Sequence, residues 1–203
     1  MWRRAILSDD GGAAAVEFAL VSIVLFFVTF AVIEGSLAAW QFNAVEKSAQ
    51  TGVRLAVVAA PVAASIETFN CGQGTGLASG TSCSDPAALS LPTVTCFGAT
   101  MSCTDGTFDA TAYGAIRDHL RRGYPFVQDA NIEIEYANSS LGFAGRPGGA
   151  IPVITLRITG VQFNFLILDV FAQLIPGAAD LDGQFIMPDV VASLTGEDLR
   201  FKL

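Results

Sequence analysis

The sequence predicts an α+β protein: a long N-terminal helix, transmembrane and then amphipathic, carries a small disulfide-containing head with an antiparallel sheet. Three observations predict this class. An apolar run near the N-terminus is long enough to span a bilayer, all four cysteines lie within 33 residues, and two later segments alternate apolar and polar residues. In addition, 52% of the 203 residues are hydrophobic and the mean hydropathy is +0.51, so we expect membrane attachment.

The predicted membrane span is residues 13–33, which as a helix is roughly 31 Å long, about the thickness of a hydrocarbon core. Arg3 and Arg4 precede it and the first basic residue after it is Lys47, so the positive-inside rule places the N-terminus in the cytoplasm and exports the remainder. Glu17 interrupts this span near its start. An acidic side chain there is costly and suggests a function, although an ordinary anchor whose glutamate reaches back to the interface is the competing explanation.

Residues 34–60 are predicted to continue the helix outside the membrane. Apolar residues recur at helical spacing, whereas Glu46, Lys47, Gln50 and Arg54 fall on another arc; the apolar set is Phe42, Val45, Ala49, Val53, Ala56 and Ala60. Pro61 is the expected break, because proline lacks the backbone N–H and clashes with the preceding turn. The apolar stripe of so long a helix must be covered by a head domain or by neighbouring helices.

Residues 61–203 are predicted to form the head, with a cysteine-containing loop at 71–103. An even number of cysteines in a stretch rich in Gly, Ser and Thr indicates two disulfides in an oxidising compartment. A zinc site is the weaker alternative, because no two cysteines have the close spacing of a zinc motif and the only histidine is His119. Four cysteines allow three pairings. We expect Cys96 with Cys103, closing a hairpin around FGAT, and Cys71 with Cys83.

The rest of the head is predicted to alternate helix and strand. Asp109 is a suitable N-cap for a helix that ends at Gly123, with Tyr113, Ile116 and Leu120 facing inward. Strands are expected at 131–136, around 152–159, and at 184–195, where Pro188 marks an edge or a bulge. Residues 163–175 form an apolar segment too short to span a bilayer, and we expect either a core helix or an interfacial one.

Neither catalytic nor nucleic-acid-binding patterns stand out. Asp118 and His119 are adjacent in a predicted helix and point in different directions, while Glu133 and Glu135 share a strand face that is more simply a solvated surface than a pair of catalytic carboxylates. A net charge of −8 and the absence of Lys and Arg between Arg54 and Arg117 argue against nucleic acid. We therefore expect no enzyme activity, no cofactor and no metal site.

The N-terminal region resembles a known family. GGAAAVEFAL, an apolar run, an acidic residue and then AAWQFNAVEKSAQTGVRLAV, spanning roughly Gly11 to Val58, are similar to TadE-like proteins. These are minor pilins or pseudopilins of the tight adherence (Tad) pilus and are made as type IV-like prepilins. The resemblance implies a cytoplasmic leader at residues 1–12, cleavage between Gly12 and Ala13 by a prepilin peptidase, and a role for Glu17 in the register of assembly. Gly11 leaves open a cut one residue earlier, and Phe18 stands where related major pilins carry tyrosine.

The resemblance also implies partners and a location. The partners are the prepilin peptidase, other Tad pilins, the inner-membrane pilus assembly machinery and membrane lipid. The protein is expected in the bacterial inner membrane as a single-pass protein with a periplasmic head, and in the extracellular pilus once assembled. The alternative is a periplasmic binding module unrelated to pili, either membrane-anchored or released by a secretory signal peptidase, for which Ser36-Leu37-Ala38 offers a small-x-small site before Ala39.

Overall fold

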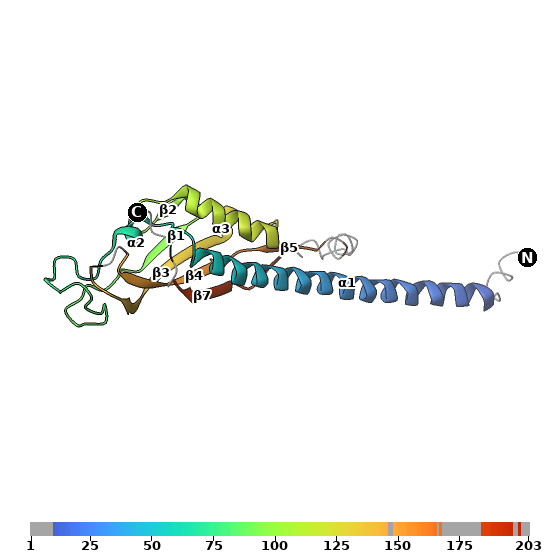
Figure 1. The fold of residues 1–203 in the computed structure, drawn as a ribbon. Coiled ribbons are helices and arrows are strands. Elements are labelled where there is room, and N and C mark those ends of the chain that lie inside the picture. The colour runs from blue at the N-terminus through green and yellow to red at the C-terminus, as the bar shows by residue number, and fades with distance from the viewer. Residues whose placement is uncertain (1–9, 146–147, 166, 168–183, 197–198, 200–203) are drawn as a thin grey trace, which may run out of the picture. The chain divides into compact units, whose positions relative to one another are not determined.

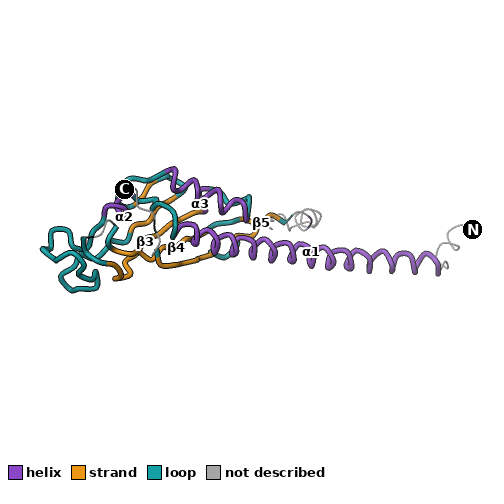
Figure 2. Tube along the Cα trace, in the orientation of Figure 1, coloured by secondary structure: helices purple, strands orange, loops and turns teal. Residues whose placement is uncertain are grey.

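The computed structural model describes residues 10–145, 148–165, 167, 184–196 and 199. It confirms the predicted class, with a long N-terminal helix and a head built on an antiparallel sheet (Figures 1 and 2). The helix is apolar, and the head contains two disulfides. The chain divides into two compact units. The first consists of Met1–Trp40 with Phe163–Phe185, and the second of Gln41–Gln162 with Ile186–Leu203.

Helix α1 (Asp10–Ala56) is continuous over 47 residues and contributes to both units. The expected extension to Ala60 ends four residues earlier, at Ala56. Val57 still donates its N–H to the carbonyl of Val53 (3.0 Å), after which the chain turns before the buried Pro61. The predicted apolar stripe is confirmed within the second unit, because Val45, Ala49, Val53 and Ala56 are all buried there.

The second unit is built on a five-stranded antiparallel sheet with the order β2-β1-β3-β4-β7. The strands are β1 (Val94–Phe97), β2 (Ser102–Cys103), β3 (Ile132–Gly142), β4 (Ala150–Ile158) and β7 (Val190–Thr195). Strand β3 is longer than the alternating sequence predicts. It passes an irregularity between Asn138 and Leu141, where the pairing with β4 shifts and Ser140 adopts a positive φ of 59°.

One face of the sheet forms the core and the other is polar. Ile134 pairs with Leu156 and Tyr136 with Ile154, and these four side chains are completely buried. The alternate residues form the opposite face, as expected for an antiparallel sheet with one solvated side; they include Thr95, Glu133, Glu135 and Arg157. The core face is where the helices of this unit pack.

Helix α3 (Ala110–Gly123) confirms the helix predicted from its cap and periodicity. The Asp109 carboxylate accepts hydrogen bonds from the N–H groups of Thr111 (2.8 Å) and Ala112 (3.0 Å), which satisfies donors that lack partners within the helix. Tyr113, Ile116 and Leu120 are buried as expected. The sequence did not predict the one-turn helix α2 (Ala64–Thr68) or the 3-10 turn at Asp129–Asn131.

The predicted final strand at 184–195 is wrong as a single element. It is two strands in different sheets: β6 (Gln184–Ile186) pairs with β5 (Gln162–Asn164), whereas β7 pairs with β4. Pro188 lies in the break between them, where its missing N–H interrupts no ladder. Of the apolar segment expected at 163–175, only 163–165 and 167 are among the described residues, so its predicted helix lies outside them.

Candidate functional site: the exposed apolar half of helix α1

The first unit exposes an apolar surface along helix α1. The large side chains from Val16 to Ile33 are mostly solvent-exposed, reaching 74% at Phe18; the set is Val16, Phe18, Leu20, Val21, Ile23, Val24, Leu25, Phe26, Phe27, Val28, Val32 and Ile33. By length and composition this helix is able to cross a membrane. A surface this apolar is not stable in water, so either lipid or other protein must cover it.

The polar side chains within this surface are satisfied by the helix itself. Three hydroxyls donate hydrogen bonds of 2.7 Å to carbonyls four residues earlier: Ser22 to Phe18, Thr29 to Leu25 and Ser36 to Val32. In lipid an unpaired hydroxyl would cost free energy, whereas a hydroxyl bonded back to the backbone does not carry this cost. The helix is therefore suited to a hydrocarbon environment at these positions.

The residues predicted to carry processing and register lie at the start of this surface. Gly12, Ala13 and Glu17 are all helical and exposed. Beyond the adjacent residues and the backbone of its own helical turn, no atom of the described residues lies within 4 Å of the position that a Cβ on Gly12 would occupy. Ala13 and Glu17 are four residues apart, so they lie on the same face one turn from each other. Glu17 is the only ionisable residue between Ala13 and Ile33.

Glu34 marks the other end of the apolar surface. It is only 3% exposed, and one carboxylate oxygen accepts a hydrogen bond from the backbone N–H of Ile167. Both residues belong to the first unit. Sequence reasoning assigned no role to Glu34. Its position immediately after the apolar run was the available signal, because a carboxylate there needs a donor.

In the second unit, the remainder of α1 packs closely and antiparallel against α3. Ser48 donates its hydroxyl hydrogen to the carbonyl of Leu120 (2.8 Å), and the Tyr124 hydroxyl donates to the Gln41 amide oxygen (2.9 Å). A Cβ on Gly52 would lie 2.5 Å from Leu120 Cδ2, so only glycine fits this crossing without displacing the core. The sequence analysis missed this contact, for which the small residues at positions 48, 49 and 52 were the signal.

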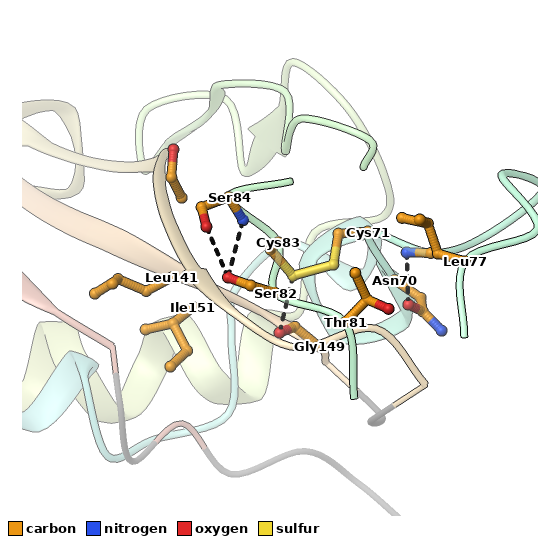
Figure 3. The surroundings of a disulfide bond; sticks show 12 residues. Asn70, Cys71, Leu77, Thr81, Ser82, Cys83, Ser84, Leu141, Gly149 and Ile151 are labelled. Atoms are coloured by element: carbon orange, nitrogen blue, oxygen red, sulfur yellow. Dashed lines mark hydrogen bonds between the residues drawn. A yellow bond between two sulfur atoms is a disulfide. The ribbon is translucent and has the colours of Figure 1, made fainter. Parts of the chain in front are cut away.

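Both disulfides of the second unit have the pairing expected from the sequence. Cys96 and Cys103 face each other across β1 and β2, with 4.0 Å between their Cα atoms. Cys71 and Cys83 close the long loop between α2 and β1, with 5.6 Å between their Cα atoms (Figure 3). The Cys83 N–H donates to the carbonyl of Gly142 (3.0 Å), which attaches this loop to the end of β3. The disulfides thus order a region that has little regular structure.

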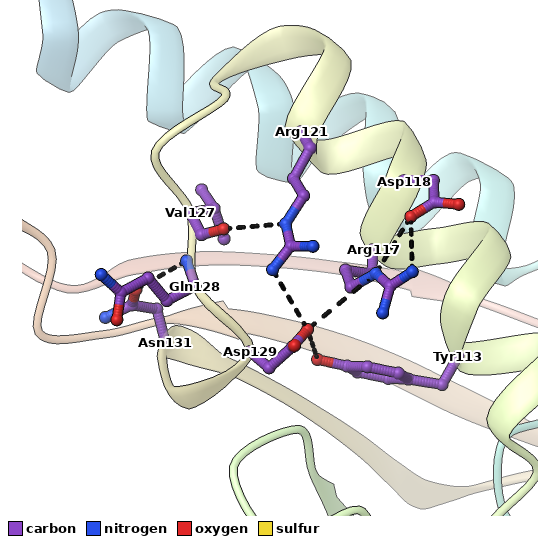
Figure 4. Close-up of polar contacts among 8 residues, drawn as sticks. All are labelled: Tyr113, Arg117, Asp118, Arg121, Val127, Gln128, Asp129 and Asn131. Atoms are coloured by element: carbon purple, nitrogen blue, oxygen red, sulfur yellow. Dashed lines mark hydrogen bonds and ion pairs between the residues drawn. The ribbon is translucent and has the colours of Figure 1, made fainter.

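The polar cluster around Asp129 has a structural role. The hydroxyl of Tyr113 donates to the Asp129 carboxylate (3.0 Å), and Arg121 and Arg117 approach the same oxygen at 3.5 and 4.0 Å (Figure 4). Burial of Tyr113 and its bond to Asp129 raise the pKa of the tyrosine. Each group is held by its neighbours, and the cluster ties the turn after α3 back onto the helix.

Two acidic groups considered in the sequence analysis also have basic partners. Asp118 pairs with Arg117, its neighbour in α3 (2.8 Å). Glu135 pairs with Arg157 on the adjacent strand (3.3 Å), on the polar face that it shares with Glu133. These ion pairs are partly exposed, as on an ordinary protein surface, and they contribute little to stability.

Comparison with known proteins agrees with the N-terminal pattern. Residues 12–54 match the family model described as TadE-like protein. No curated protein and no solved structure matches the chain. The matched range contains the Gly12–Ala13 bond, Glu17, the exposed apolar surface and most of the α1 residues that pack in the second unit. The TadE-like family is structural rather than enzymatic. The chain thus carries a TadE-like segment at residues 12–54, within an N-terminal helix that fits a single-pass membrane anchor.

Proposed function

We propose that this protein is a minor pilin or pseudopilin of a Tad-type pilus system, made as a prepilin and processed after Gly12. The observation that carries the proposal is the TadE-like match, which covers both the junction from Gly12 to Phe18 and the exposed apolar helix. Before assembly the helix anchors the protein in the inner membrane, with the N-terminus in the cytoplasm and the head in the periplasm. During assembly the same apolar surface passes from lipid to neighbouring pilin helices.

Cleavage between Gly12 and Ala13 creates the charge that Glu17 needs. The new α-ammonium group lies one helical turn from Glu17, on the same face. In a bundle of pilin helices, where water is scarce, an ammonium group of the same or an adjacent subunit compensates the carboxylate and fixes the axial register. The run Ala13-Ala14-Ala15 has small side chains and allows helices to approach closely at this level.

The partners follow from this life cycle. The prepilin peptidase acts on the exposed Gly12–Ala13 junction, the assembly machinery of the inner membrane engages the anchored protein, and other Tad pilins pack against α1. The head, residues 61–203 in this scheme, presents the periplasmic surface through which partner pilins are contacted. Its two disulfides stabilise the head for a structural role in such an assembly.

Mass spectrometry of the mature N-terminus in the native host tests this proposal. A mature protein that begins at Ala13 supports it. A mature protein that begins at Ala39 indicates a secretory signal. Such a cut would remove the apolar span but keep Gln41–Ala56, the part of α1 that belongs to the second unit. A mature protein that begins at Met1 indicates an uncleaved anchor. Either result overturns the prepilin assignment.

Two glycine variants refine the position of the cut. Gly12→Leu is expected to abolish processing, because the peptidase would meet a large side chain at the residue before the scissile bond. Gly11→Leu, the matched control one residue earlier, is expected to remain processed. The opposite pattern would place the cut after Gly11.

A further inference from the structure

We propose that the β5–β6 ribbon, formed by Gln162–Asn164 and Gln184–Ile186, lies in the lipid interface of the membrane that α1 crosses and gives the protein a second contact with lipid. The inference rests on the anchoring role of α1 proposed above and goes beyond it. A single-pass anchor needs only its own helix, whereas this ribbon comes from a part of the chain more than a hundred residues later.

The composition of the ribbon suits an interface. Its six residues carry no charge and comprise three apolar side chains, Phe163, Phe185 and Ile186, and three amides. Phe185 is 47% exposed and Ile186 63% exposed. Because adjacent strand residues point to opposite faces, the ribbon offers apolar groups on both sides. Aromatic side chains combined with uncharged polar groups are favoured at the boundary between hydrocarbon and headgroups.

The contact with Glu34 places the segment just after β5 at the end of the apolar span of α1. Glu34 directly follows Ile33, the last residue of the apolar span, and it accepts its hydrogen bond from the backbone of Ile167, three residues beyond β5. The carboxylate is nearly inaccessible to solvent. A carboxylate at the hydrocarbon edge is costly unless it receives hydrogen bonds, and the chain leaving β5 supplies one. The segment therefore lies where α1 leaves the membrane.

Lipid is the occupant that these observations favour. A two-stranded ribbon is marginally stable in water, so its exposed apolar groups need a covering. A protein partner would be expected to meet charged groups that set orientation at the rim of its interface, and the two strands carry none.

Tryptophan fluorescence quenched by lipids with brominated acyl chains tests the inference. The full chain is reconstituted into phosphatidylethanolamine–phosphatidylglycerol vesicles after Trp2 and Trp40 are replaced by Phe, and single tryptophans are introduced. Phe185→Trp and Ile186→Trp report on the two faces of the ribbon. Phe26→Trp reports on the span of α1, and Val191→Trp is the matched control, at 52% exposure on β7 of the large sheet.

We expect a strong loss of fluorescence for Phe26→Trp, a smaller loss for at least one ribbon position, and none for Val191→Trp. We use two reporters in the ribbon so that the test still works if one of the substitutions disturbs the pairing of β5 with β6. If Phe26→Trp is quenched while both ribbon positions behave like Val191→Trp, the ribbon inference is wrong and the anchor stands. If Phe26→Trp itself escapes quenching, the anchoring role of α1 fails and the inference fails with it.

Discussion

At the scale of single residues, the fold depends on buried polar groups whose partners come from distant segments. The backbone N–H of Val62 donates to the hydroxyl oxygen of Tyr136 (2.9 Å), and the tyrosine is fully buried. Val62 follows Pro61, at the point where the chain turns after α1, so the hydroxyl satisfies a donor that no helix or strand can reach. Such a bond fixes the route of the chain as well as contributing stability.

Tyr136 also predicts how stability depends on pH. Burial raises the pKa of Tyr136, and the same holds for Tyr113. The unfolded tyrosine loses its proton near pH 10, as ordinary tyrosine does, while the folded one keeps it, so the folded state binds more protons above that pH. The contribution of these groups to stability is therefore complete below about pH 10 and is lost as the pH rises toward the folded pKa.

We expect Tyr136→Phe to lower the free energy of unfolding by about 1–3 kcal/mol at neutral pH, because Val62 keeps a buried N–H without an acceptor. Above about pH 10 its stability should fall less steeply than that of the unmodified chain, because one of the raised pKa values is gone. Denaturant titration in detergent, followed by near-ultraviolet circular dichroism across this pH range, measures both effects. An alkaline decline as steep as that of the unmodified chain would contradict the assignment.

At the scale of elements, the sequence predicts those whose local signals agree with their packing. Asp109 and the spacing of Tyr113, Ile116 and Leu120 define α3, and the short separation of Cys96 and Cys103 indicates the β1–β2 hairpin. The apolar and polar alternation predicts the first half of β3 but is lost beyond Tyr136, where only the pairing with β4 keeps the strand extended. Local periodicity carries no information about such a partner.

The split between β6 and β7 shows the same limit. Pro188 indicates that the strand expected at 184–195 is interrupted, and the sequence analysis interpreted this as an edge or a bulge within one strand. Which sheet each half joins is decided by partners distant in the chain, β5 for one and β4 for the other. The contact of Glu34 with Ile167 is likewise beyond local prediction, since 133 residues separate them and the donor is a backbone group.

The crossing of α1 and α3 predicts a position-specific effect of side-chain size. A Cβ on Gly52 would lie 2.5 Å from Leu120 Cδ2 and 3.0 Å from Leu156 Cδ2, and both leucines are completely buried. We expect Gly52→Val to destabilise the head by about 1–3 kcal/mol through overpacking. Gly114→Val is the matched control, because Gly114 also lies in a helix but has open space around it, and we expect a change within about 0.5 kcal/mol.

The same denaturant titration distinguishes the two glycine variants. Loss of stability at Gly52 alone would show that the helices cross at the observed distance. Equal effects at both positions would mean that helix propensity decides the outcome, and the close contact would lose its support.

At the scale of the whole molecule, polarity divides along the chain. The apolar surface of α1 lies in the first unit, whereas the second unit has a buried core, a polar sheet face and two disulfides. The sequence predicts this division because hydropathy and cysteine content change abruptly along the chain. It also predicts Gly12, Ala13 and Glu17 as candidate site residues through the family resemblance, since cleavage has no signature in composition or periodicity. The ribbon could not be predicted, because it depends on strand pairing.

From this division of polarity and the proposed function, we expect Glu17 to be required for assembly but not for folding of the head. The residue is exposed on α1 and far along the chain from the buried core, so Glu17→Ala should leave the head folded and the Gly12–Ala13 bond cleavable. In the proposed assembly, α1 leaves lipid for a bundle of helices and the α-ammonium group of Ala13 enters an apolar environment, so the loss of its carboxylate partner is expected to cost about 3–5 kcal/mol. We therefore expect Glu17→Ala to be processed normally and yet to fail to support piliation.

Mass spectrometry of the N-terminus measures the processing of Glu17→Ala, and electron microscopy of surface pili measures its assembly. The matched control is Glu46→Ala, because Glu46 is an exposed acidic residue on the part of α1 that belongs to the second unit. Normal piliation by Glu17→Ala would exclude the register role, and failure of both variants would show that any lost carboxylate on α1 prevents assembly.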